Sequence, residues 1–276
     1  MSASTEEIKG TSLWKDAWKR LLKNKLAVFG LIVLTIMAFA VIFGPIILFW
    51  TRGITAEFIP SGIDNGALVK SFPPSWEHFM GTDDKGRDLF ARVLQGGRIS
   101  LMVGIISTIV SLIVGVSYGA TAGYLGGRID NIMMRIVDII YAIPYILIVI
   151  VLLSVFGGPN APAFITGLAG TFGGGQGLSQ IFLLFFALGL VSWLTMARVV
   201  RGQILSLKNQ EFVLAARATG VSTPKIIFKH LVPNALGPVI VYATLTVPSI
   251  MLTEAFLSFL GMGVQAPYAS WGSLAA

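Results

Sequence analysis

An uninterrupted apolar run from Leu26 to Trp50 limits the folds open to this chain more than any other feature. A membrane-spanning helix needs about 20 mostly apolar residues, and this run is too long for the apolar part of a secretory signal. Only 12% of the residues are charged and 55% are hydrophobic, which is outside the range of water-soluble domains. The sequence therefore predicts an all-α polytopic membrane protein. Its expected spans cover residues 26–50, 99–124, 132–156, 179–199 and 236–260.

Lysine and arginine are unevenly distributed between the segments that separate these spans. Residues 1–25 form a polar, amphipathic lead with six Lys or Arg, and residues 198–230 carry six more. Residues 157–178 have none, and in residues 51–98 six basic side chains are balanced by six acidic ones. Because Lys and Arg gather in cytoplasmic loops, the N-terminus is expected in the cytoplasm. Trp14 and Trp18 would anchor the lead at the membrane surface.

Residues 211–233, with the sequence EFVLAARATGVSTPKIIFKHLVP, form a polar and basic island between the last two spans. Good helix formers from about Val200 to Thr219 end at Gly220, the residue type best suited to a left-handed turn after a helix. A second helix can begin at Ser222 or Thr223 with a hydroxyl cap and end before Pro233.

The second helix of this island is expected to be two-faced. Ile226, Ile227 and Leu231 would share one face, and Lys225 and Lys229 would lie four apart on another. We therefore predict a helix, a glycine turn and a second helix that meet water, and we call residues 200–235 the docking loop.

Several blocks of sequence resemble a known family. Ala215 and Ala216, three residues, Gly220, nine residues and then His230 to Pro233 are similar to the EAA loop of ABC importer permeases, which docks on the ATPase subunit. The blocks MARVVRGQILSLKNQEFVLAAR (196–217), KHLVPN (229–234), EAFLSFLGMGVQAP (254–267) and MGTDDKGRDLFARVLQGGR (80–98) resemble OppC/DppC-like permeases of oligopeptide and dipeptide importers. The resemblance runs from about Trp14 to Ala276. One departure is Leu214, which stands where the general motif has glutamate.

The resemblance implies a type I ABC importer transmembrane domain in a bacterial inner membrane, with residues 99–260 as the permease core. It implies a second permease subunit, two ATP-binding subunits and an extracytoplasmic peptide-binding protein as partners. ATP and Mg²⁺ would bind the ATP-binding subunits, and this chain would hold no cofactor or metal. A sixth helix is expected beyond Ala276, which would leave residues 261–276 outside. The ATPase-coupling residues that it implies are Glu211, Leu214, Ala215, Ala216, Arg217, Gly220, Lys225, Lys229, His230 and Pro233.

Small side chains recur at every fourth position of the second span. They are Ser107, Ser111, Gly115, Gly119 and Gly123. Such a stripe lets another helix approach closely in lipid, so we predict a central, tightly packed helix. A glycine-lined substrate path along the same face is the alternative.

Ionisable residues near the spans give further expectations. Arg135 and Asp138 are one turn apart and should form a local pair, and Pro144 should kink the third span. Glu254 either lines a pathway or reaches outer water.

The long loop of residues 51–98 should contain a short helix capped by Thr82 or Asp83, with Asp88 paired to Arg92. This helix would either receive a soluble binding protein or brace the next span. His78 and His230 are expected to be structural or contact residues.

Nothing in the sequence predicts chemistry on this chain. It has no cysteine, no HExxH segment and no Gly-rich phosphate loop followed by Lys and Ser or Thr. Its basic residues lack the interleaved aromatics of a nucleic-acid platform, so no nucleic-acid partner is expected. An ATP-driven permease subunit is the favoured function. A secondary transporter driven by an ion gradient, and an ABC permease for nickel or glutathione, are the alternatives.

Overall fold

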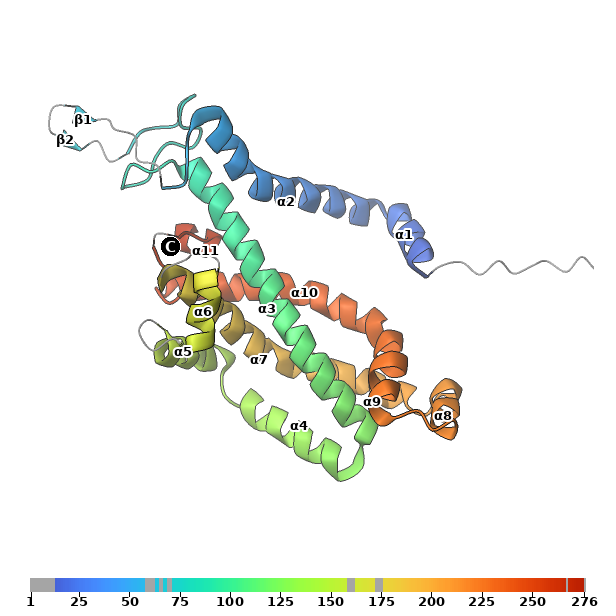
Figure 1. Ribbon diagram of the computed structural model, residues 1–276. Helices are drawn as coiled ribbons and strands as arrows, with labels where there is room; N and C mark the ends of the chain where they lie inside the picture. The colour runs from blue at the N-terminus through green and yellow to red at the C-terminus, as the bar shows by residue number, and fades with distance from the viewer. Residues whose placement is uncertain are drawn as a thin grey trace, which may run out of the picture.

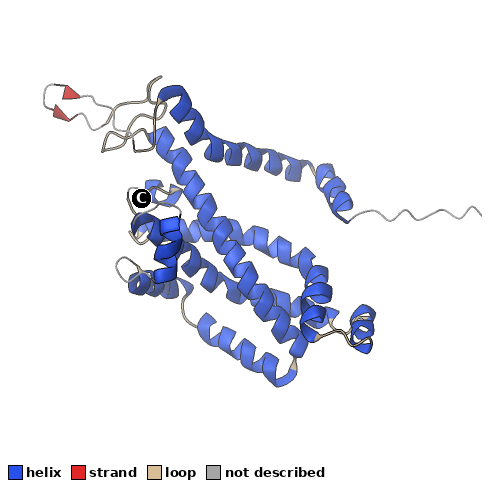
Figure 2. Ribbon diagram, viewed as in Figure 1, coloured by secondary structure: helices blue, strands red, loops and turns tan. Residues whose placement is uncertain are grey.

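The computed structural model describes residues 13–57, 63–64, 67–68, 71–157, 162–171, 176–266 and 268–275. Residues 1–12 of the expected lead, and Pro267 and Ala276 of the expected outer segment, lie outside this described part. Helices dominate the fold, and Figure 2 shows two very short strands as the exception. These strands, β1 (Ile63–Asp64) and β2 (Ala67–Leu68), pair antiparallel in a small hairpin that the all-α prediction did not include.

Two helices form the N-terminal region, α1 (Leu13–Lys23) and α2 (Lys25–Arg52). Asn24 separates them, and its side-chain oxygen accepts hydrogen bonds from the backbone N–H groups of Leu26 and Ala27. Most of α2 runs apart from the other helices in Figure 1, and it buries only Val41 and Leu48. A long apolar helix with outward-facing side chains is suited to contact with lipid.

The second span is one continuous helix, α3 (Leu89–Leu125), and the separate short helix expected before it is absent. Its N-cap is Asp88, whose carboxylate accepts from Ala91 N at 2.7 Å, so the expected cap at Thr82 or Asp83 is wrong. Gly96 and Gly97 do not interrupt the helix, because they lie inside it against the C-terminal segment, where a Cβ atom would crowd Ser270 and Trp271.

The third span is broken more sharply than a proline kink. Helix α4 (Gly127–Tyr141) and helix α5 (Tyr145–Phe156) meet at an angle of 81°. Pro144 lies at the N-terminus of α5, where its missing N–H leaves no hydrogen bond unmade. Because the residue before a proline disfavours helical geometry, α4 ends just ahead of it.

Helix α7 (Gln176–Leu207) is the centre of the bundle, and it extends two turns beyond the expected end of the fourth span. It follows the short helix α6 (Ala163–Thr171) and packs along α3. Its buried side chains include Leu184, Leu188 and Ile204. These contacts make α3 and α7 the structural axis of the molecule (Figure 1).

The docking loop joins α7 to the last long helix through α8 (Glu211–Ala218), α9 (Thr223–Lys225) and a π-helical segment, η2 (Ile226–Leu231). Helix α10 (Val232–Phe259) continues directly, so residues 223–259 form one continuous helical segment. The expected break at Pro233 is wrong. The N–H of Val232 donates to the carbonyl of Ile227, five residues back, and such π turns accommodate a proline in a membrane helix.

Within the described residues, four helices are long and apolar enough to cross a membrane, and the bent α4–α5 pair could make a fifth span. The last helix is α11 (Trp271–Ala275), beside the start of α3. One end of the bundle therefore carries α8 and α9, and we call it the docking end. The opposite end carries α6, α11 and residues 71–88 (Figure 1).

Candidate functional site

The docking loop turns at Gly220, which adopts the predicted left-handed conformation with φ of 74°. The N–H of Val221 donates to Ala216 O, and the N–H of Gly220 donates to Arg217 O, each at 3.0 Å. This pair of bonds is the Schellman arrangement, which satisfies the last carbonyls of α8. The Ser222 side chain makes no capping hydrogen bond, contrary to the expected hydroxyl cap.

The docking loop has one buried and one exposed face. Ile226, Ile227 and Leu231 are at most 4% exposed, and they pack with Val213 and Ala216 into a cluster that also contains side chains of α7 and α10. The exposed coupling candidates are Glu211, Leu214, Ala215, Arg217, Gly220, Lys225, Lys229 and Pro233, and His230 is half-buried. The outer face is therefore basic with apolar positions, while the inner face fixes the loop to the bundle.

Two polar contacts connect the docking loop and the end of α7 to α3. The guanidinium of Arg217 lies 4.9 Å from the ring centroid of Tyr124, and its Nε donates to the Tyr124 hydroxyl at 3.2 Å. Lys208 Nζ donates to Gly123 O at 3.1 Å. Helix α3 therefore holds α8 although the two are far apart in sequence.

Ion pairs join α4 to α7 near the same end. Arg201 binds both carboxylate oxygens of Asp130, at 2.6 and 2.7 Å, and Arg198 binds Asp138 at 2.8 Å. The expected pair between Arg135 and Asp138 is wrong, because α4 lies beside α7 and offers Asp138 a partner 60 positions away. Sequence analysis missed Asp130, and the only available signal was an acidic residue facing the basic end of the fourth span.

The small-residue stripe of α3 lies against α7. A Cβ atom at Gly115 would be 2.7 Å from Met196 Cβ, and one at Gly119 would be 3.0 Å from Ala197 Cα. Ser107 and Ser111 are fully buried, and their hydroxyls have no hydrogen-bond partner in the described part of the chain. Helix α7 thus fills the space in which a path along this stripe would run.

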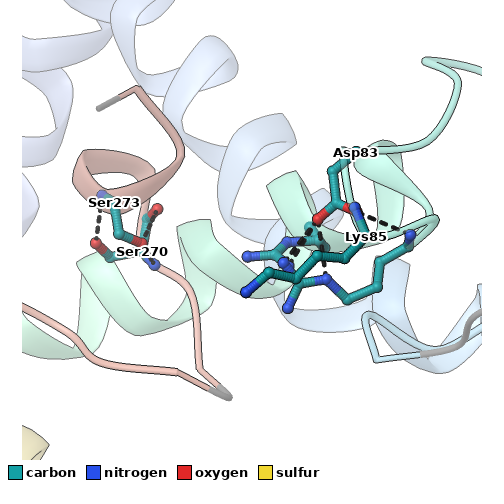
Figure 3. A network of polar contacts seen from close by, with 6 residues as sticks. Asp83, Lys85, Ser270 and Ser273 are labelled. Atoms are coloured by element: carbon teal, nitrogen blue, oxygen red, sulfur yellow. Dashed lines mark hydrogen bonds and ion pairs between the residues drawn. The ribbon is translucent and has the colours of Figure 1, made fainter. Parts of the chain in front are cut away.

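Glu254 is fully buried, so it does not reach outer water. Its Oε1 accepts hydrogen bonds from Ser258 at 2.6 Å and Ser270 at 2.7 Å, and its Oε2 accepts from Ser100 at 3.3 Å. Ser100 in turn accepts from the backbone N–H of Trp271. This serine network holds the C-terminal segment on α3 and α10, and Figure 3 shows the adjoining pair of Ser270 and Ser273.

A second polar network surrounds Asp83 at the same end of the molecule (Figure 3). Burial acts to raise the pKa of Asp83, but hydrogen bonds from the backbone and side chain of Arg87 and from Lys85 N outweigh it, so its pKa is lowered. Arg92 also binds Asp83, at 2.9 Å. The expected pair between Asp88 and Arg92 is wrong, since Asp88 caps α3 and binds His78 Nδ1 at 2.8 Å.

We expect the Asp83 network to stabilise the protein in a pH-dependent way. Because the folded-state pKa lies below the ordinary aspartate value of about 3.9, the stabilisation is present above that value and is lost as pH falls through the lowered pKa. Asp83→Asn should therefore unfold at a lower temperature than the parent near neutral pH, and the difference should shrink below about pH 4. Thermal unfolding of both purified proteins across pH checks this, and a pH-independent difference would contradict it.

A cavity of about 580 Å³ lies between the α4–α5 break, α7 and α10. Its wall includes Tyr145, Ser192, Thr195, Thr246 and Ser249, none of which sequence analysis selected. The available signal was the spacing of Thr246, Ser249 and Thr253, which places three hydroxyls on one face of α10. Pro144 indicated a kink at this place, but the size of the bend that opens the cavity has no such signal.

Comparison with known proteins adds family information to this geometry. Residues 115–276 match the family described as binding-protein-dependent transport system inner membrane component. Residues 12–56 match the N-terminal TM domain of oligopeptide transport permease C.

Individual relatives match over almost the whole chain. The oligopeptide transport system permease protein OppC of Escherichia coli K12 is 48% identical, over 97% of this chain and 79% of its own length. OppC of Bacillus subtilis is 43% identical, over 97% of this chain and 77% of its own length. The dipeptide transport system permease protein DppC of Bacillus subtilis is also 43% identical, over 96% and 73%. The chain belongs to the family of binding-protein-dependent transport system inner membrane components, as an OppC/DppC-like permease.

Proposed function

We propose that this chain is a permease subunit of an ATP-driven importer of oligopeptides or dipeptides in a bacterial inner membrane, with a type I ABC importer transmembrane fold. The observation that carries the proposal is the docking loop. A polar, basic helix–glycine–helix segment lies at one end of an apolar bundle, with Leu214 50% exposed and the opposite face locked into the core. Such a surface is suited to contact with a water-soluble partner, while the long apolar helices of the bundle are suited to contact with lipid.

Coupling would require that the docking loop move as one body with the spans. Three features support this. The Schellman turn at Gly220 fixes α8 relative to α9, and α9, η2 and α10 follow one another without a break in the helix. Arg217 binds Tyr124 of α3, so a displacement of α8 would also move α3. A displacement of α8 caused by the ATPase would thereby be transmitted to α3 and α10.

The partners in this proposal are those of a binding-protein-dependent system. A second permease would complete the pathway, and two ATP-binding subunits would bind ATP and Mg²⁺ and hydrolyse ATP. An extracytoplasmic peptide-binding protein would deliver substrate at the end that carries residues 71–88. With the docking end in the cytoplasm, α1 would also lie on the cytoplasmic side (Figure 1). The chain is a transmembrane component and not itself an enzyme.

An ion-driven mechanism fits the described residues less well. Secondary transporters bind their coupling ions at broken helices near the membrane midplane. The α4–α5 break is such an interruption, but residues 142–144 at the break are Ala142, Ile143 and Pro144, without charge. The two aspartates of α4, Asp130 and Asp138, instead pair with arginines of α7.

Purification of the tagged chain in mild detergent, with mass identification of its partners, tests the proposal. We expect a second permease and ATP-binding subunits to copurify. After reconstitution with the binding protein, labelled peptide should enter vesicles only with ATP. Uptake of nickel or glutathione without peptide uptake would contradict the substrate class, and gradient-driven uptake without ATP would contradict the mechanism.

A further inference from the structure

The cavity at the α4–α5 break has a polar but uncharged wall. Hydroxyl groups reach it from all three sides, and among the residues that the structure describes no Asp, Glu, Lys or Arg lines it. Helix α5 contributes Tyr145, α7 contributes Ser192 and Thr195, and α10 contributes Thr246, Ser249 and Thr253. Its volume of about 580 Å³ lies within the range of about 300–1,000 Å³ typical of small-ligand sites.

Some hydroxyls of this wall make hydrogen bonds within the chain, and others do not. Ser192 donates to Leu188 O at 2.8 Å, and Thr246 donates to Tyr242 O at 2.9 Å. The hydroxyls of Thr195 and Ser249, in contrast, make no hydrogen bond within the part of the chain that the structure describes. Exposing such groups to hydrocarbon is unfavourable, so water or a polar occupant must meet them.

One pair of charged groups, Arg198 and Asp138, lies at an edge of the cavity and not in its wall. The guanidinium of Arg198 lies 4.1 Å from the ring centroid of Tyr141, which lines the cavity, and Arg198 also binds Asp138. The charge of Arg198 is thus already paired. The cavity offers its occupant hydrogen bonds without preferring either sign of charge.

We propose that this cavity is the section of the peptide path that this chain contributes, and that its free hydroxyls bind the backbone of the peptide in transit. The inference rests on the proposed function. A hydroxyl can both donate and accept a hydrogen bond, so it suits peptide C=O and N–H groups alike. Backbone groups are common to all peptides, and a wall without charge accepts many side chains. Single neutral hydrogen bonds are also weak enough to release the peptide.

Cysteine chemistry can test this directly, because the chain contains no cysteine. Ser249→Cys would place one thiol in the cavity. Thr244→Cys is the matched control, because Thr244 lies on the same helix but lines a separate groove with apolar neighbours such as Leu236 and Ile240. Both variants are assembled with their partner subunits, treated with a charged, water-soluble thiol reagent, and scored by the mass of this chain.

We expect the thiol of Ser249→Cys to react with the reagent. Adding ATP and a peptide that is transported should slow this reaction severalfold. The thiol of Thr244→Cys should stay unreactive in lipid. Tryptophan substitutions at the same two positions give an independent readout. Ser249→Trp should lower peptide uptake at least tenfold with all subunits retained, and Thr244→Trp should transport like the parent.

Several results would overturn the assignment. For Ser249→Cys, these are a thiol that does not react, or a reaction rate that peptide does not change. For Ser249→Trp, these are peptide uptake at the parental level, or loss of the second permease, which would indicate that Ser249 lies at a subunit contact. Peptide uptake by the parent complex is measured in parallel. If the parent complex takes up no peptide, the proposed function is contradicted. If the parent takes up peptide and Ser249→Trp takes it up equally well, only the cavity assignment is contradicted.

Discussion

Gly119→Leu is expected to leave little folded protein in the membrane. The position faces Ala197 so closely that a Cβ atom would meet backbone atoms, 3.0 Å from the carbonyl carbon and from Cα. Overpacking a tight contact costs about 1–3 kcal/mol when side chains can shift. Here a helix backbone must move instead, so we expect the upper end of that range or more. Abundance in membranes and monodispersity after solubilisation measure the effect.

Gly30→Leu is the matched control for this change. Gly30 lies in the lipid-suited helix α2, and nothing is within 4 Å of the position where its Cβ would lie. The same substitution should therefore leave abundance at the parental level. Normal abundance of Gly119→Leu with an altered substrate preference would show that the stripe lines a path and does not pack.

The long apolar helices could be predicted from the sequence because their signal is local. A run such as 26–50 must be a helix in lipid whatever surrounds it, and helix α2 covers that run. The conformation of Gly220 was equally predictable, since glycine after a helix is a strong local signal. The buried face of η2 followed from the spacing of its apolar residues.

The errors arose where contacts distant in sequence decide the outcome. Asp138 was given a partner one turn away, but α7 brings Arg198 closer. Pro233 was expected to end a helix, yet the π turn before it lets the helix continue. The outer-water alternative for Glu254 is wrong, because three serines from α3, α10 and the C-terminal segment surround its buried carboxylate.

The cavity could not be predicted because it arises from the bend between two helices. A proline in the third span indicates a kink, but its size depends on how α5 packs on α7. An angle of 81° separates the helices far enough to open a hollow that a modest kink would leave filled.

Gly220→Val is expected to abolish transport while insertion and abundance stay near the parental level. The limitation is conformational and not steric, because nothing lies within 4 Å of the added Cβ while φ is 74°. A β-branched residue in a left-handed conformation costs at least about 1–2 kcal/mol. The turn should relax to another geometry and misdirect α8 relative to α9. Since Gly220 lies between α8 and α9 and outside the long apolar helices, membrane insertion is not expected to depend on it.

Gly237→Val provides the matched control, because Gly237 also has open space but lacks a positive φ. Leu214 gives a second contrast within the loop. Leu214→Ala should have a milder effect than Gly220→Val, since it removes an exposed apolar side chain and no ion pair. Leu214→Glu restores the general motif and should strengthen docking on the ATPase.

Capture of the ATP-binding subunits by Gly220→Val tests the central claim most directly, because the claim is that the docking loop carries the ATPase contact. The tagged chain is purified from membranes in mild detergent, and the retained ATPase and the peptide uptake of the same membranes are measured beside Gly237→Val and Leu214→Ala. The account predicts weakened ATPase capture and no uptake for Gly220→Val, with near-parental values for Gly237→Val. Parental capture and uptake by Gly220→Val, together with an inactive Leu214→Ala, would contradict it.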